Sequence, residues 1–146
     1  MKDLHIEEPG FDTDFQLEEH IGFRLRLAAQ RHVEIFARRL PEVTPPQFAV
    51  MVKLSEQGPV SQNYLGRLVG LDAATAKGVV DRLEGKGFVS RARSPRDQRK
   101  IDVSLTEEGA SFVSRAIPDA QAVARETMTR LTDRERERLL ALLAKL

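Results

Sequence analysis

Apolar residues recur at steps of three and four along residues 15–40, and no proline interrupts that segment. This spacing predicts one long helix, because a helix turns by about 100° per residue. The apolar positions fall on two sides of it: Ile21, Leu25, Ala29, Phe36 and Leu40 on one, Phe23 and Leu27 on the other. A helix that is apolar on two sides needs two partners, and we expect a second subunit to supply one of them.

A second helix is predicted to begin after Thr44. Pro45 suits the first helical position, and Gln47 lies three residues after Thr44, which is the spacing of a capping box. The segment "QFAVMVKLSEQG" continues this helix, and Gly58 is expected to end it.

Two further capped helices follow after a short extended "PV". Ser61 is placed to cap "QNYLGRLVG", and Asp72 to cap "AATAKGVVDRLEGKG", with Gly87 just beyond the end of the helix. Two short helices joined by a tight Gly-Leu-Asp corner predict a helix-turn-helix. The buried stripe of the second is expected to be Ala76, Val79, Val80 and Leu83, leaving Thr75, Lys77, Gly78 and Arg82 facing out.

Residues of like character then recur at every second position in "FVSRAR" and "KIDVSL", which is the period of a β-strand. With "SPRDQR" between them, the two segments predict a β-hairpin. The stretch "RARSPRDQRK" holds five basic residues and one carboxylate, so the hairpin tip is cationic. A helix-turn-helix followed by such a hairpin is a winged helix.

The remaining residues predict two more helices. Thr106 can cap a helix through "EEGASFVSRAI", which we expect Pro118 to kink or break before it resumes as "DAQAVARETMTRL". Thr132 and Glu135 form a capping box ahead of the last helix, whose apolar positions are Leu139, Leu140, Leu142, Leu143 and Leu146. The predicted fold is therefore mainly α with a small β-hairpin.

Length and composition fit one domain over residues 1–146, with a winged helix-turn-helix over 44–105 and helical dimerisation segments over 15–40 and 106–146. The chain has no cysteine, which removes disulfides and thiolate chemistry. No apolar run is long enough to span a bilayer, and the N-terminal "MKDLHIEEPGFDTDF" is acidic where a signal peptide would be basic and then apolar. We expect a cytoplasmic protein.

Charge is distributed unevenly along the chain. Residues 61–103 carry nine basic residues against five acidic ones, a net charge of +4, whereas the whole chain has a net charge of +1. Such a basic centre favours a nucleic-acid surface, and a solvated charged face is the alternative. An enzyme is not indicated, because the sequence has no Gly-rich phosphate loop and no Ser-His-Asp arrangement, and no cofactor is expected.

The segments "TPPQFAVMVKL" and "DAATAKGVVDRLEGKGFVSR", and above all Asp97-Gln98-Arg99 followed by "VSLTEEG", resemble the MarR family of bacterial transcriptional regulators. The similarity covers roughly residues 15–146. The resemblance implies a cytoplasmic homodimer, joined through its N- and C-terminal helices, that binds a pseudo-palindromic site in double-stranded DNA. It also implies a repressor in which each subunit contributes a recognition helix and a wing.

On this assignment the fourth helix lies in the major groove. Ala73, Ala74 and Thr75 would contact thymine methyl groups, Lys77 would donate to guanine or phosphate, and Arg82 shares their outward face. Gly78 is unfavourable in a helix by about 1 kcal/mol relative to alanine. It allows either a close approach of DNA or close contact within the core.

The other predicted DNA contacts come from the third helix and the wing. Ser61, Gln62 and Asn63 would meet a phosphate, although Ser61 would cap its helix in either case. In the wing, Arg99 matches the family arginine that reaches toward the minor groove, and Asp97 is expected to order the loop by pairing with a neighbouring arginine. The remaining cations are expected to contact the DNA backbone: Arg91, Arg93, Arg96 and Lys100. A solvated hairpin tip is the alternative.

A ligand site is predicted on the first helix. His32 lies on its apolar face near Phe36, and Arg24 and Arg26 flank that face. Cations beside an apolar cleft suit an aromatic carboxylate or the phosphates of a coenzyme A ester. Tyr64 takes the place of an acidic capping residue and is expected to face the dimer cleft. A histidine satisfied within the core, and arginines that are solvated or bridge the dimer, are the alternatives.

The segments "AAQRHVEIF", "GPVSQNYLGRL" and "DAATAKGVVDRL" also resemble the branch of the family that controls the catabolism of hydroxycinnamates and related aromatic acids. That resemblance implies release of DNA on binding a small aromatic acid or its coenzyme A thioester. A constitutive DNA-binding or architectural protein without an effector is the alternative. A metal site shared by His20 and His32 within one subunit is excluded, because twelve residues of helix separate them by about 18 Å.

Overall fold

The computed structural model describes residues 14–146, so His5 and the acidic N-terminal stretch lie outside the described residues. The helices are η1 (Leu17–Glu19), α1 (Ile21–Arg39), α2 (Pro45–Gln57), α3 (Gln62–Leu68), α4 (Ala73–Gly85), α5 (Glu107–Thr127) and α6 (Asp133–Leu143). The strands are β1 (Val60–Ser61), β2 (Val89–Arg93) and β3 (Ile101–Leu105). This confirms a mainly helical fold with a small antiparallel sheet.

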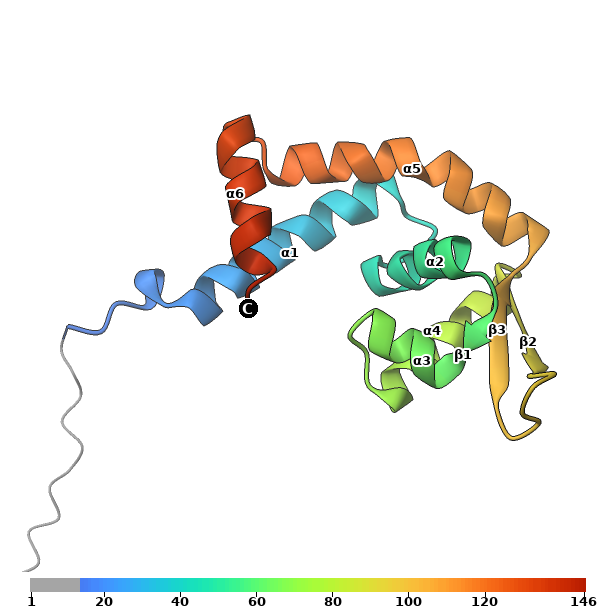
Figure 1. The fold of residues 1–146 in the computed structure, drawn as a ribbon. Coiled ribbons are helices and arrows are strands. Elements are labelled where there is room, and N and C mark those ends of the chain that lie inside the picture. Colours follow the sequence, from blue (N-terminus) through green and yellow to red (C-terminus); the bar gives the residue numbers. More distant parts are fainter. Residues whose placement is uncertain (1–13) are drawn as a thin grey trace, which may run out of the picture.

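The elements form two regions (Figure 1). Helices α2, α3 and α4 and the three strands make up one of them, and α1, α5 and α6 make up the other, in which α1 runs beside α5. No helix of the described residues is long and apolar enough to cross a membrane.

The first helix begins later than the sequence predicts. Residues 17–19 form a separate 3-10 turn, and His20 is extended and caps α1 by accepting a hydrogen bond at Nδ1 from the N–H of Gly22 (3.2 Å). The backbone N–H of His20 ends the turn by donating to the Leu17 carbonyl, and its imidazole starts the helix. The apolar positions of α1 are buried only near its C-terminal end, at Ile35 and Phe36, whereas Ile21 remains 60% exposed.

The predicted caps of the next helices are confirmed. Thr44 and Gln47 exchange hydrogen bonds between side chain and backbone, which is a complete capping box. Ser61 caps α3 by accepting from the N–H of Tyr64, and Asp72 caps α4 by accepting from that of Thr75. At the ends of α2 and α4, Gly58 and Gly87 have φ values of 75° and 78°.

The wing is the predicted hairpin with one strand added. Strands β2 and β3 pair antiparallel from Val89↔Leu105 to Arg93↔Ile101, and β1 pairs with the other edge of β3 through Val60↔Val103. The sheet order is therefore β1-β3-β2. A two-residue strand shows no alternation, which is why the sequence indicated only an extended segment there.

Helix α5 is continuous through Pro118, so the break that was one of the two expected outcomes does not occur. Proline removes the bond to the carbonyl of Ser114, but both residues lie on the exposed side, where that carbonyl can bond water. The opposite side is held in the core by buried Phe112, Val113, Ala116 and Val123. The helix changes direction along its length without breaking (Figure 1).

Candidate nucleic-acid interface

The fourth helix exposes the side that the sequence predicts. Its buried stripe is Ala76, Val79, Val80 and Leu83, which pack into the core. Thr75, Lys77 and Arg82 are exposed on the other side, together with Ala73 and Ala74 in the first turn. The helix therefore presents small and cationic side chains to solvent along one face.

Gly78 lies on this outer side with almost nothing over it. A Cβ at this position would meet only the Arg82 Nη1 atom, at 3.4 Å, which is an ordinary contact with the end of a flexible side chain. The fold itself therefore gives no reason for glycine here.

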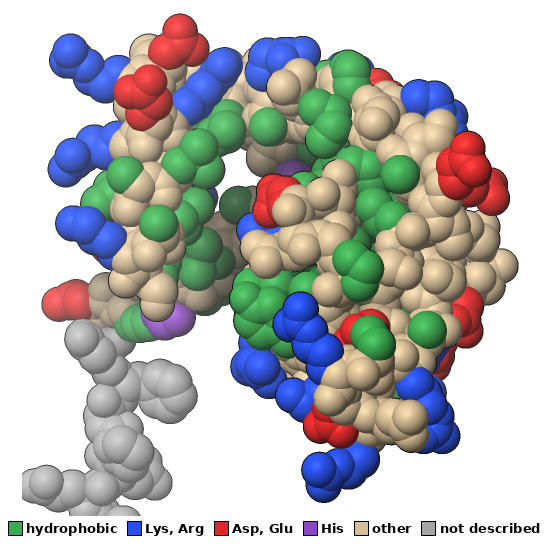
Figure 2. All heavy atoms as spheres, turned by 45° about the vertical axis from the view of Figure 1, so that its right-hand side comes forward, with side chains coloured by type: hydrophobic (Ala, Val, Ile, Leu, Met, Phe, Trp, Pro, Cys, Tyr) green, Lys and Arg blue, Asp and Glu red, His purple; other side chains and the backbone are tan. Residues whose placement is uncertain are grey.

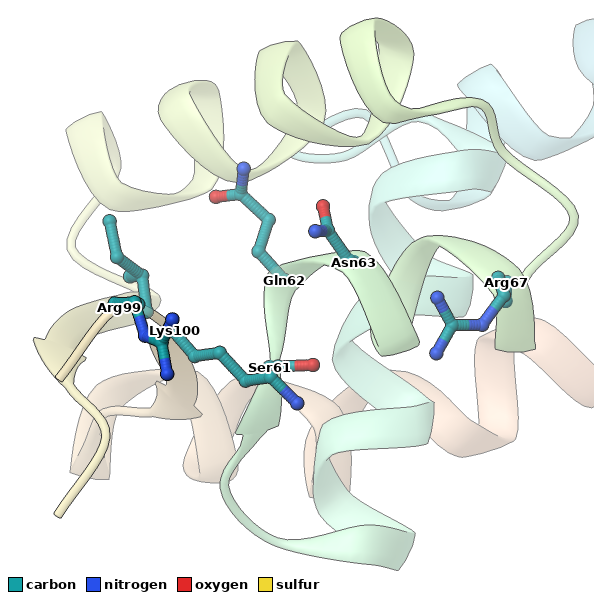
Figure 3. Close-up of a pocket in the computed structure, with 7 residues that line it drawn as sticks. Ser61, Gln62, Asn63, Arg67, Arg99 and Lys100 are labelled. Atoms are coloured by element: carbon teal, nitrogen blue, oxygen red, sulfur yellow. The ribbon is translucent and has the colours of Figure 1, made fainter. Parts of the chain in front are cut away.

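The start of α3 and the loop of the wing border a common hollow of about 300 Å³. Ser61, Gln62 and Asn63 lie on one side of it, and Arg99 and Lys100 on the other (Figure 3). These residues are separated by more than thirty positions in the chain, and the pairing of β1 with β3 brings them together. The hollow is lined by polar and cationic groups, and Ile101 is its one apolar side chain.

Arg67 also lines this hollow, although it was not among the DNA contacts predicted from the sequence. Its guanidinium stands 5.7 Å from the centroid of the Tyr64 ring. The signal was available, because Arg67 follows Asn63 by four residues and so lies on the same side of α3. A second hollow of about 590 Å³ lies beside the first and is lined by Tyr64, Arg67, and residues of the wing.

The tip of the wing is an ordered turn. The backbone N–H of Arg99 donates to Asp97 Oδ1 (3.0 Å), and the N–H of Lys100 donates to the Asp97 carbonyl (2.9 Å). Asp97 also lies 3.5 Å from the Arg99 Nε, while the Arg99 side chain is 94% exposed. Arg93, Arg96 and Lys100 are exposed as well. Lysine and arginine side chains gather over this end of the winged helix (Figure 2).

Arg91 is different from the other wing cations. Its side chain is only 17% exposed and pairs with Asp81 and Glu84 of α4. Asp81 also bonds Lys77 Nζ at 2.9 Å. Hydrogen bonds from Arg91 and then Lys77 lower the pKa of Asp81, so this carboxylate stays ionised. Arg91 is thus engaged within the winged helix in this structure.

The structure brings together two of the five predicted ligand-site residues. His32 and Phe36 lie with ring centroids 6.0 Å apart, and His32 Nδ1 is 3.3 Å from Thr127 Oγ1. Because Thr127 Oγ1 donates its proton to the carbonyl of Val123 (2.8 Å), Nδ1 is the donor of the pair. His32 therefore has an internal partner that the sequence could not identify, and its Nε2 atom points to no partner among the described residues.

The other three lie apart. The Arg24 Nε atom donates to the Glu18 carbonyl (2.5 Å), and the Arg26 guanidinium lies 5.6 Å from the Phe23 ring centroid, both on the exposed half of α1. Tyr64 is beside the wing. The structure does not join these three residues to His32 within one subunit.

An ion-pair cluster that the sequence did not suggest joins α1 to α5. Glu126 pairs with Arg38 and Arg39, each at 2.9 Å, and its backbone carbonyl accepts from Arg31 (3.2 Å). Hydrogen bonds from Arg39 and Arg38 hold the pKa of Glu126 below its usual value of 4.5. Arg31 thus fixes the end of α5.

Two helices joined by a tight corner, with a basic hairpin beside them, define a winged helix-turn-helix protein. The sequence model of the MarR family matches residues 43–101. The HTH-type transcriptional repressor NicR of Pseudomonas putida is 36% identical over 137 residues, covering 92% of this chain and 87% of NicR. The chain belongs to the MarR family of transcriptional regulators.

Solved structures show the same fold. A probable transcriptional regulator from Pseudomonas aeruginosa has a TM-score of 0.86 and 41% identity, covering 89% of this chain and 98% of that one. BpsR of Bordetella bronchiseptica, whose DNA binding is regulated by 6-hydroxynicotinic acid, has a TM-score of 0.85 and 34% identity, covering 90% of this chain and 95% of BpsR. The resemblance stated from the sequence is therefore confirmed.

Proposed function

We propose that this MarR-family regulator is a homodimeric, sequence-specific repressor that leaves its operator when a small aromatic acid binds. The observation that carries the DNA part is the meeting of the α3 N-terminus with Arg99 and Lys100 of the wing around one polar and cationic hollow. Together with the exposed outer face of α4, the recognition helix of this proposal, these groups supply the helix and the basic wing that a groove-binding surface requires.

On this proposal α4 enters the major groove and the wing follows the backbone toward the minor groove. Ala73, Ala74 and Thr75 meet base edges, and Lys77 and Arg82 donate to bases or phosphates. Ser61, Gln62 and Asn63 contact a phosphate, and Arg93, Arg96 and Lys100 supply affinity that depends on salt. Asp97 keeps the turn that presents Arg99.

A dimer is supported by the apolar side chains that one subunit leaves exposed. Helix α6 has no buried residue in the single chain. Four of its leucines are 38–57% exposed: Leu139, Leu140, Leu142 and Leu143. On α1, Ile21, Leu25 and Leu27 are 60%, 41% and 38% exposed. Apolar positions on two helices of the same region fit a second copy of that region.

The effector is proposed from the position of His32 beside Phe36 and from what the relatives bind. NicR is named a repressor, and BpsR responds to 6-hydroxynicotinic acid, an aromatic acid. His32, with Phe36 beside it, presents a ring nitrogen next to an aromatic surface. The ligand acts by preferring a dimer whose recognition helices are wrongly spaced for the operator, and it shifts DNA affinity by no more than its differential affinity for the two states.

The test is a fluorescence-anisotropy titration of the purified protein, at fixed salt, on DNA from upstream of its own gene and on a scrambled duplex. Each titration is repeated with 6-hydroxynicotinate, p-coumarate, ferulate and the coenzyme A thioesters of the last two. Binding to the upstream DNA at least a hundredfold tighter than to the scrambled duplex, relieved by one compound, supports the whole proposal. Tight binding that none of them relieves favours the constitutive DNA-binding protein, and equal binding to both duplexes contradicts a sequence-specific regulator.

A further inference from the structure

We propose that Arg91 is a positioning residue for DNA readout, which fixes the recognition helix α4 relative to the wing and α3 instead of contacting phosphate. This inference rests on the proposed DNA-binding function and deepens it. It reassigns one of the wing cations that the sequence grouped together as backbone contacts.

The first argument is that one side chain joins three elements. Arg91 comes from β2 and pairs with Asp81 of α4 through Nη2. Its Nε lies 3.5 Å from Glu84 Oε2, one turn further along α4. Its Nη1 donates to Gln62 Oε1 at the start of α3 (3.3 Å). The planar guanidinium is suited to this role because its donors point in several fixed directions at once.

The second argument is accessibility. The Arg91 side chain is 17% exposed, and its Nε is enclosed without a hydrogen bond, the only such side-chain atom among the described residues. To reach a phosphate, Arg91 would have to leave two carboxylates. Arg93 lies two residues further on the same face of β2, yet it is exposed and donates only to the Gln98 carbonyl.

The third argument is the place of Asp81. This carboxylate lies on α4 one turn after Lys77 and binds both Lys77 and Arg91. A carboxylate on a DNA-facing helix would repel phosphate, and two cations neutralise it here. Removal of the Arg91 side chain would therefore release α4 from the wing, leave Asp81 paired with Lys77 alone and leave Glu84 without its cation beside the DNA.

The test compares Arg91→Ala with Arg93→Ala, which removes the same charge from the same strand face. Operator and scrambled-duplex affinities are measured at several salt concentrations. Removing a cation that binds a phosphate lowers the slope of log K against log salt by about one and weakens binding to both duplexes alike. We expect that result for Arg93→Ala. For Arg91→Ala we expect roughly a tenfold loss of affinity for the operator, a smaller loss for the scrambled duplex and an unchanged slope, since misplaced base contacts reduce discrimination.

A double-mutant cycle with Asp81→Asn keeps the inference testable if Arg91→Ala is less stable. Because both changes break the same ion pair, the double variant should lose clearly less operator affinity than the sum of the single losses. Circular dichroism and thermal melting establish that each variant is folded at the assay temperature. Arg91→Lys should bind the operator little better than Arg91→Ala, since an ammonium group cannot hold three partners in fixed directions.

A slope that falls by about one in Arg91→Ala with equal losses of affinity for both duplexes would overturn the inference, and so would additive losses in the cycle. Wild-type protein that does not distinguish operator from scrambled DNA would instead overturn the proposed function. The two failures are therefore distinguishable.

Discussion

Gly109 lies against the carbonyl of Phe88 so closely that a Cβ on the glycine would be 2.0 Å from that oxygen. Thr106 fixes this contact from both sides. Its N–H donates to the Phe88 carbonyl (3.1 Å), its hydroxyl donates to the Gly87 carbonyl (2.6 Å), and its Oγ1 accepts from the N–H of Gly109 (3.0 Å). The Leu-Thr-x-x-Gly motif thus joins the first turn of α5 to the residues that open the wing.

We predict that Gly109→Ala destabilises the protein by about 3 kcal/mol, the upper part of the range for an added methyl group with no space. The methyl group must push the Phe88 backbone away and so displace β2. Urea denaturation followed by circular dichroism measures the free energy of unfolding. Gly85→Ala is the control, because a Cβ there meets nothing within 4 Å, and it should leave stability unchanged or raise it by up to about 1 kcal/mol. Equal stabilities of Gly109→Ala and wild type would contradict this reading of the motif.

Most of the helices and strands were predicted from patterns among neighbouring residues. These patterns are the capping boxes at Thr44 and Thr132 and the period-two pattern of the wing, which depend only on neighbours in sequence. What they missed depends on tertiary contacts. The strand β1 exists only because β3 offers it an edge, and the Thr127 partner of His32 lies 95 residues away. Arg91 was predictable in part: it lies on the same face of β2 as buried Val89, so alternation already places it toward the core.

On the outer side of α4, a substitution of Gly78 is expected to raise the stability of the protein and to lower its affinity for the operator. Gly78→Ala should raise the free energy of unfolding by about 0.5–1 kcal/mol, because alanine favours the helix and meets only the end of Arg82. Operator affinity should nevertheless fall, since the methyl group would stand on the face of α4 that the proposed binding mode turns toward DNA. Urea denaturation and anisotropy on the same samples measure the two effects. If Gly78→Ala is more stable than wild type and binds the operator with unchanged affinity, DNA does not approach Gly78.

Arg99 should matter to DNA binding and to nothing else. Its side chain is 94% exposed, so Arg99→Ala should leave the melting temperature unchanged. We expect operator affinity to fall by roughly tenfold or more, with a salt slope lower by about one if the contact is to phosphate. Arg130→Ala, which removes an exposed cation after the end of α5, serves as the matched control and should bind like wild type. Unchanged affinity in Arg99→Ala would contradict the assignment of the wing.

The Glu126 cluster predicts a dependence of stability on pH. Its pKa is lowered in the folded protein, so its ion pairs with Arg39 and Arg38 stabilise the fold above about pH 4.5 and are lost as the pH falls through the folded pKa. Glu126→Gln should therefore be less stable than wild type at pH 7, and the difference should shrink below about pH 4.5. Urea denaturation between pH 3 and 7 measures it, with Glu34→Gln on the exposed side of α1 as the control. A difference that is constant over this range would contradict the ion pairs.

Variants of His32 and of its partner Thr127 distinguish a role of His32 in effector binding from a purely structural role. If its ring contacts the effector, His32→Ala should bind operator like wild type without ligand but need about tenfold or more of the relieving acid to be released, which is within the usual range of coupling between sites. Thr127→Val keeps the imidazole and removes its hydrogen-bond partner, so it should respond to the acid in an intermediate way. Anisotropy titrations of the effector against protein bound to operator measure all three proteins. If both variants lose thermal stability while their release by the acid matches wild type, His32 only joins α1 to α5, and the ligand binds elsewhere.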